Sequence, residues 1–350
     1  MIQRDAALRV ARLAGEVLED SQARLRLSDG YTRVDPIGIA EGEGIDVMVR
    51  PLDKLLGAFL REDRIGILLN SQRPTGMFHM TCAHELGHFY LNHGSTADEQ
   101  LDYPSHASTF ELEADQFAYS LMAPQWLIVH VLKAQRWKWK SLQDPAILYQ
   151  LSLRLGLSYT AMLWSVARMG RLEAATARAL ANITPAEIKR ALVPQGTVLG
   201  PNQDIWRVGP SDKEAILEPR PDDHIVMELP SHAAAGYLWS VTDAQQEGYV
   251  LKPIFFDGRT RPRSVGGSDV PVGGTAVVRY EFDFPREERQ ELSSAPVRVA
   301  FEEVQPWNAA GRGAAAHGVD GFALRTQVEA IEEGLGVRSR QRRVEGVQDE

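Results

Sequence analysis

Residues 80–91 constrain the fold of this chain more than any other part of the sequence. They contain His84, Glu85 and His88 in the pattern His-Glu-x-x-His. Residues four apart lie on one face of a helix, so both imidazoles could bind a single zinc ion there. Glu85 would then lie beside the metal without being a ligand, placed to take a proton from the attacking water. The pattern predicts a helix that carries a zinc site; an ordinary amphipathic helix with two histidines is the alternative.

A third ligand is predicted in residues 109–122, which show the apolar periodicity of a helix. Glu111 and Asp115 are four apart and share a face, whereas Glu113 points elsewhere. Glu111 as third ligand, with Asp115 accepting a hydrogen bond from a ligand histidine, gives the open site that catalytic zinc requires. Manganese or iron(II) suits the same donors. A solvated acidic helix face is the alternative.

Four other residues near this motif carry predictions. Gly87 costs the helix about 1 kcal/mol relative to alanine, which indicates a close packing neighbour. Cys82 is the single cysteine of the chain, which excludes internal disulfides. We expect Cys82 to be a small buried residue, with redox sensing as the alternative. His93 and His106 lie in a polar loop, where each either stabilises charge in the transition state or is a plain surface histidine.

Short strands are predicted before the motif helix, after an amphipathic helix at residues 4–20. Residues 45–49 and 65–70 are typical of strands, and residues 52–60 of a loop or short helix. The order strand, loop, helix could lay the edge of a sheet over the metal. We therefore predict that a substrate peptide pairs along the strand at 65–70.

Residues 144–193 are helical by pattern and include a segment typical of a helix-turn-helix, with Ser158 as a cap and with Arg154, Tyr159 and Thr160 facing outward. Basic and aromatic residues interleave at 133–140, either as a nucleic-acid patch or as tryptophans packed inward with solvated lysines. The net charge of −9 argues against a general polyanion binder. We do not expect DNA to be a partner.

The pattern changes after the Pro- and Gly-rich residues 194–203. Short alternating apolar runs separated by turns then indicate an all-β sandwich. We predict an α+β protein with three parts: a mostly helical zincin-like domain with a small sheet at 1–195, an immunoglobulin-like sandwich at 203–308 and a flexible tail at 309–350. The tail could hold a short helix near 324–335. No apolar run is long enough to span a membrane and residues 1–20 lack the core of a signal peptide, so we expect a cytoplasmic protein without membrane contact.

Residues 65–124 resemble the ImmA/IrrE family of zinc metallo-endopeptidases. The resemblance is carried by the motif at 80–88, by Glu-Leu-Glu-Ala-Asp-Gln-Phe-Ala from Glu111, and by Leu-Met-Ala-Pro at 121–124. It implies zinc ligands at His84, His88 and Glu111, with Glu85 as general base. It also implies cleavage of a cytoplasmic helix-turn-helix repressor, which would switch on stress or mobile-element genes. A non-catalytic, zinc-stabilised regulator that acts through contacts of the β-domain is the alternative.

Residues 222–308 resemble the chagasin family of cysteine-peptidase inhibitors in three loops. The first loop lacks the usual Asn-Pro-Thr-Thr of that family, and the third begins with Gln in place of Arg. These departures argue against inhibition of papain-like peptidases, and we expect the sandwich to bind a peptide or protein partner in a recognition or sensing role. The alternative is that Trp239 and Trp307 are core and turn residues of an unrelated sandwich. The residues predicted to form its partner-binding loops are Gly236, Tyr237, Trp239, Gly266, Gly267, Pro306 and Trp307.

Overall fold

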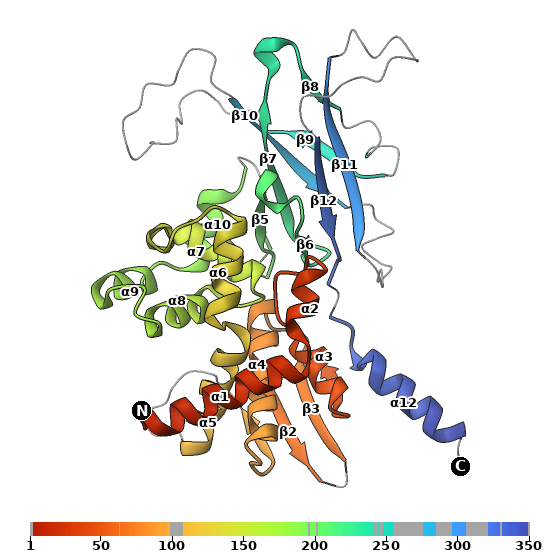
Figure 1. Ribbon diagram of the computed structural model, residues 1–350. Coiled ribbons are helices and arrows are strands. Elements are labelled where there is room, and N and C mark those ends of the chain that lie inside the picture. Colours follow the sequence, from red (N-terminus) through yellow and green to blue (C-terminus); the bar gives the residue numbers. More distant parts are fainter. Residues whose placement is uncertain are drawn as a thin grey trace. The chain divides into compact units, whose positions relative to one another are not determined.

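The computed structural model divides the chain into two compact units, which are considered separately (Figure 1). The first unit comprises Met1–Ile188 and Ile331–Glu350, and the second comprises Lys189–Ala330. The fold is α+β, as the sequence predicts. No helix in the described part of the chain combines the length and apolar character needed to cross a bilayer. The structure describes residues 3–62, 64–98, 108–194, 197–200, 202–240, 244, 248–254, 276–284, 296–305, 321–329 and 331–348.

The sheet of the first unit has the strand order β13-β1-β3-β2-β4. Strand β3 is parallel to β1 on one side and antiparallel to β2 on the other, with Ile67 opposite Val47 and Phe59. Because both edges of β3 are already paired, the prediction that a substrate pairs along residues 65–70 is wrong. The expected loop or short helix at 52–60 is also wrong in part, because β2 forms there and buries Phe59. The bounds are β1 Asp46–Arg50, β2 Gly57–Arg61, β3 Ile65–Asn70, β4 Thr96–Asp98 and β13 Gly334–Leu335.

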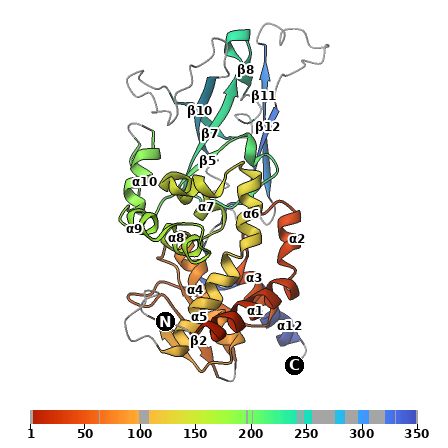
Figure 2. The same cartoon turned by 60° about the vertical axis from the view of Figure 1, so that its left-hand side comes forward.

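Helix α4 lies at the centre of this unit, between the sheet and other helices (Figure 2). It packs on β2 and β3, helix α5 packs on α4, and α1 packs on α5. Its residues from Phe78 to His88 are all buried, because α4 has neighbours on every side. The motif histidines are therefore held in a packed interior. The bounds are α1 Arg4–Asp20, α2 Ala23–Ser28, α3 Pro36–Gly42, α4 Thr75–Tyr90, α5 Thr109–Met122, α6 Gln125–Ala134, α7 Pro145–Arg154, α8 Tyr159–Arg168, α9 Ala174–Ala181 and α10 Pro185–Leu192.

The predicted helix-turn-helix forms as α7 and α8, with Ser158 accepting a hydrogen bond from the backbone of Ala161 as the α8 cap. Thr160 is exposed, as predicted. The same prediction is wrong for Arg154 and Tyr159, which are only 1 % and 3 % exposed. Arg154 donates to the backbone of its own helix and Tyr159 to that of α9. The pair of helices α7 and α8 is therefore a packing unit.

At residues 133–140, both tryptophans are half-buried and the lysines are exposed.

The C-terminal residues differ from the expected flexible tail wherever the structure describes them. Strand β12, Gly321–Thr326, pairs with β11 where a helix was expected. Strand β13 pairs with β1, and α12, Val337–Gln348, follows it. The backbone and hydroxyl of Ser339 donate to the buried carboxylate of Glu41 in α3, and Arg342 donates to the Glu41 and Ile45 carbonyls. These polar contacts hold α12 against the end of α3 within the first unit.

The second unit is a sandwich of two four-stranded sheets, β5-β7-β10-β9 and β6-β12-β11-β8. Buried aromatic rings fill the space between the sheets, as where Phe282 of β10 meets Phe301 of β11 at a centroid separation of 6.3 Å. Alternating inward residues supply this core, as the sequence predicts. The bounds are β5 Ile205–Val208, β6 Ile216–Leu217, β7 His224–Ser231, β8 Leu238–Ser240, β9 Val250–Pro253, β10 Ala276–Asp283 and β11 Val297–Val304.

Candidate metal centre

Three donor atoms from two helices converge in the first unit. His84 and His88 lie one turn apart on α4, and Glu111 lies in the first turn of α5. The two Nε2 atoms are 3.1 Å apart, and Glu111 Oε2 lies 3.2 Å from His84 Nε2 and 3.7 Å from His88 Nε2. Both histidines are buried, whereas the Glu111 side chain is 30 % exposed and marks the open side of the cluster. The structure thus brings together the three residues that the sequence predicts as ligands.

The separations of these donors match what zinc requires. A tetrahedral ion at about 2.0–2.1 Å from each nitrogen or oxygen holds its donors about 3.3–3.4 Å apart. The observed distances of 3.1, 3.2 and 3.7 Å bracket that value. The hydrogen bond to His84 and the nearby His88 ring also hold the pKa of Glu111 below its usual range, so its carboxylate is ionised and fit to bind a cation. These residues therefore fit a zinc ion with one coordination position left for solvent or substrate.

Each histidine is oriented by a contact at its second ring nitrogen. His84 Nδ1 lies 2.9 Å from Asp115 Oδ1, one turn beyond Glu111 on α5, in the contact predicted from their spacing. His88 Nδ1 lies 3.0 Å from Nδ1 of His93. Such contacts fix the tautomer and the direction of a metal-binding imidazole. Asp115 and His93 thus hold the two rings with Nε2 turned toward Glu111.

The end of α4 explains why His93 lies beneath His88. Asn92 has a left-handed backbone with φ of 58°, which glycine or asparagine adopts most readily. The backbone of His93 then donates to the carbonyl of His88, and that of Asn92 donates to Phe89. This pair of bonds is the Schellman ending of a helix. The Leu-Asn-His sequence after the motif was the signal that could have placed His93 here.

Glu113 is the residue of this site that the sequence reasoning missed. It points away from the face of Glu111, as the spacing predicts, but it is buried and not solvated, with Oε2 3.6 Å from His93 Nε2 and Oε1 2.7 Å from Arg9 of α1. The spacing of Glu111 and Asp115 identifies only the face that these two residues share, and the turn that carries His93 packs against another face of α5. Burial and the nearby His88 lower the pKa of His93, so its ring is neutral. Both ring nitrogens face protein groups, which differs from the predicted role in stabilising a transition state.

Glu85 follows His84 on α4 and is fully buried. Its Oε2 accepts a hydrogen bond of 3.4 Å from the hydroxyl of Thr96 in β4. Its Oε1 lies against Gly57 of β2, where a Cβ would come within 3.0 Å of that oxygen and 2.5 Å of the Thr81 side chain. The absence of a side chain at Gly57 therefore leaves room for the carboxylate between helix and sheet.

Two further predictions about α4 concern its packing. At Gly87 a Cβ would lie 2.9 Å from Cα of Ala114, so the close neighbour expected there is the backbone of α5. Cys82 is completely buried, and burial raises the pKa of its thiol. A buried protonated thiol is unreactive, which favours the packing role over redox sensing.

The predicted partner-binding loop of the second unit is anchored from inside the sandwich. Glu303 of β11 is fully buried and accepts hydrogen bonds of 2.7 and 2.6 Å from the backbone and ring of His232. Gly236 then turns the chain with φ of 81°, and Tyr237 is half-buried. Trp239 differs from its prediction, since it is 8 % exposed and donates to the Pro230 carbonyl. Its ring belongs to the core. The predicted residues His106, Gly266, Gly267, Pro306 and Trp307 lie outside the described residues.

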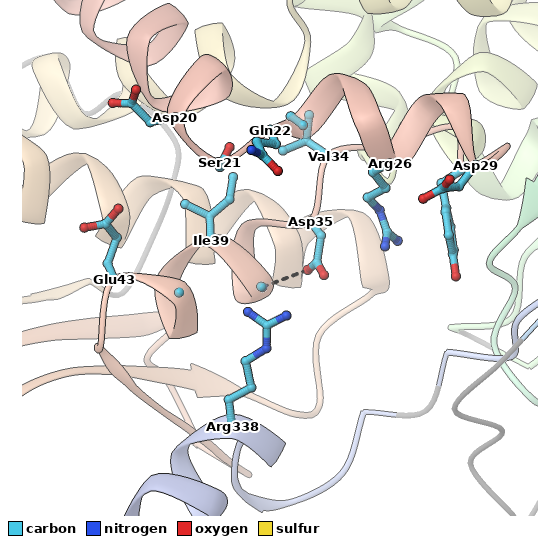
Figure 3. Close-up of a pocket in the computed structure, with 14 residues that line it drawn as sticks. Asp20, Ser21, Gln22, Arg26, Asp29, Val34, Asp35, Ile39, Glu43 and Arg338 are labelled. Atoms are coloured by element: carbon cyan, nitrogen blue, oxygen red, sulfur yellow. Dashed lines mark hydrogen bonds between the residues drawn. The ribbon is translucent and has the colours of Figure 1, made fainter.

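A cavity of about 440 Å³ lies elsewhere in the first unit, between the α1–α2 turn, α3 and α12 (Figure 3). Arg338 of α12 points into it toward α3, whose first turn is capped by Asp35. Asp20 and Glu43 add negative charge to its wall. None of the three candidate ligands lines this cavity, so it is distinct from the metal centre.

Comparison with known proteins agrees with this geometry for the first unit. No curated protein matches the chain. Among solved structures, the cysteine protease inhibitor EhICP2 from Entamoeba histolytica is similar at 13 % identity, covering 37 % of this chain and 100 % of that chain, with a TM-score of 0.22. Residues 40–163 match the family model of the IrrE N-terminal-like domain, a peptidase family. The match spans α4 and α5 with the whole donor cluster. This part of the chain is therefore similar to the IrrE N-terminal-like domain, which supports a metallopeptidase-like function for it.

Proposed function

We propose that this protein is a zinc-dependent endopeptidase with His84, His88 and Glu111 as zinc ligands. The observation that carries the proposal is the convergence of three donor atoms from α4 and α5 at the separations of a tetrahedral site. Glu111 is partly exposed, so one side of the donor cluster is open to solvent. Catalytic zinc sites have such an open position, whereas structural zinc sites are closed. Zinc bound there would polarise the scissile carbonyl and activate a water molecule.

Glu85 is assigned the role of general base. It is next to a ligand in sequence but contributes no atom to the donor cluster. Its carboxylate is buried and held by Thr96, which limits its motion and keeps it out of bulk water. In this role Glu85 takes the proton of the attacking water and passes it to the leaving amine.

The substrate is a peptide that adds to the edge of the sheet at β4. Strand β4 is last in the described strand order and pairs only with β2 there. An exposed edge offers backbone groups that an extended peptide can pair with. Because Thr96 of β4 contacts Glu85, a peptide at this edge would pass close to the general base. We therefore place the substrate peptide beside β4 and not beside the central strand β3.

The family resemblance implies that the natural substrate is a helix-turn-helix repressor in the cytoplasm, whose cleavage derepresses stress or mobile-element genes. In this scheme the second unit binds a peptide or protein partner through its anchored loop. The exposed Ala233 and Ala235 in that loop offer a small apolar contact on a rigid base provided by Glu303. Such preorganisation lowers the entropic cost of binding.

The test is co-expression with repressors encoded by neighbouring genes, followed by detection of metal-dependent fragments. Wild-type protein should release a fragment that a chelator suppresses. Glu85→Gln should retain one zinc per chain and lose cleavage by at least about 100-fold, the scale of general base catalysis. Glu16→Gln, the same change on the exposed face of α1, is the matched control and should cleave normally. Normal cleavage by Glu85→Gln would overturn the mechanism, and an intact cellular phenotype without cleavage would favour the regulator.

A further inference from the structure

We infer that Glu113 is a positioning residue of the metal centre, which acts through His93 to set the tautomer of the ligand His88. The inference rests on the proposed zinc site. It is carried by a continuous row of contacts: His88 Nδ1 to His93 Nδ1 at 3.0 Å, His93 Nε2 to Glu113 Oε2 at 3.6 Å, and Glu113 Oε1 to Arg9 at 2.7 Å. His93 and Glu113 are both buried, so water does not readily replace the contact between them.

The positions of the protons along this row follow from simple exclusion. A neutral imidazole that binds metal through Nε2 carries its proton on Nδ1. Because His88 Nδ1 then donates, His93 must accept with an unprotonated Nδ1 and carry its own proton on Nε2. That proton faces the Glu113 carboxylate, which only accepts. Glu113 thus favours the one tautomer of His93 that can receive the His88 proton.

Arg9 fixes which oxygen of Glu113 faces the site. It reaches from α1 to Oε1 and leaves Oε2 to His93. The two ligand histidines are therefore supported differently. His84 meets the carboxylate of Asp115 directly, whereas His88 meets one through an intervening imidazole. The orientation of the His88 ring therefore depends on residues of α1 and of the turn after α4, because its contact with a carboxylate passes through His93.

Replacing the carboxylate by an amide gives a sharp test. In Glu113→Gln, the Arg9 guanidinium can only donate, so it favours the amide oxygen over the amide NH₂, and the NH₂ then faces His93. His93 Nε2 must then accept, its proton moves to Nδ1, and two N–H groups oppose each other at His88. We expect zinc affinity to fall about 10- to 100-fold, the usual effect of losing an outer partner of a metal ligand.

The double variant Arg9→Ala with Glu113→Gln should recover part of this loss. Without Arg9 the amide can turn and present its oxygen to His93, which restores the productive tautomer. A purely structural role of the ion pair predicts the opposite, namely that removing both partners is no better than removing one. Zinc affinity that is higher in the double variant than in Glu113→Gln alone therefore separates positioning from packing.

The measurements use the full-length protein. Zinc affinity is read by chelator competition, the ligand field by the visible spectrum of the cobalt(II) form, and the His93 tautomer by long-range ¹H–¹⁵N NMR of the zinc form. Glu41→Gln is the matched control, because Glu41 and Glu113 are each 7 % exposed and hydrogen-bonded. It should leave all three readouts unchanged.

The outcomes separate this inference from the proposed function. Loss of zinc affinity in Glu113→Gln with recovery in the double variant supports the inference. Unchanged affinity and an unchanged His93 tautomer in Glu113→Gln would overturn it while leaving the zinc site intact. Failure of the wild-type protein to bind zinc would instead overturn the proposed function.

Discussion

Substituting Gly87 by alanine tests whether the contact between α4 and α5 builds the metal centre. The added Cβ would lie 2.9 Å from Cα and 3.0 Å from the carbonyl oxygen of Ala114, whereas ordinary contact begins at 3.4 Å. Both neighbours are backbone atoms, so the helices must separate by about 0.5 Å. Ala114 lies less than one turn from Glu111, so the shift would carry that carboxylate with it. Metal ligands tolerate errors of only about 0.2 Å.

The expected energy follows from a matched substitution. Gly15 lies within α1 with no atom near the place of a Cβ, so Gly15→Ala should stabilise the protein by about 1 kcal/mol through helix propensity alone. Gly87→Ala gains the same propensity but adds overpacking of about 1–3 kcal/mol. The difference between the two variants should therefore be about 1–3 kcal/mol, with Gly87→Ala the less stable.

The assay is urea unfolding of the metal-free protein followed by circular dichroism, with zinc affinity measured separately by chelator competition. Gly87→Ala should bind zinc more weakly than wild type, and Gly15→Ala should bind it equally well. Equal stability of the two variants, or unchanged zinc affinity in Gly87→Ala, would refute the claim that close backbone packing positions Glu111.

Three further predictions concern the same region. Gly57→Ala should lower the rate of peptide cleavage while zinc, measured by metal analysis, stays bound, because the new Cβ crowds Thr81 and Glu85 rather than the ligands. Asn92→Val should weaken zinc binding, because a β-branched residue resists the left-handed turn that delivers His93; Asn92→Gly should bind normally, and equal affinities would contradict this reasoning. Removing zinc with a chelator should lower the free energy of unfolding by about 2.7 kcal/mol when the free zinc concentration had been 100 times its dissociation constant, and calorimetry should show this as a lower melting temperature. An unchanged melting temperature would argue against a site in the folded state.

The sequence alone determined the parts of this protein that depend on local periodicity. The spacing of His84 and His88 puts both rings on one helical face wherever that helix lies, and the spacing of Glu111 and Asp115 does the same on the next helix. The change to alternating apolar residues likewise predicted a β-sandwich, because alternation matches only a strand with one buried face. Local rules of this kind do not depend on distant parts of the chain.

Only the tertiary structure decided what lies next to these faces. Glu113 points away from Glu111 along α5, yet it belongs to the site because the turn after α4 and Arg9 of α1 come to meet it. Residues 334–348 dock on α3 and β1 across nearly 300 positions of sequence, and no local pattern encodes that distance. The sequence of β3 does not distinguish a central strand from an edge strand. Only its pairing with β1 and β2 shows that a substrate cannot join it. Contacts between segments far apart in sequence depend on the shapes of both, which is why periodicity along one of them could not reveal them.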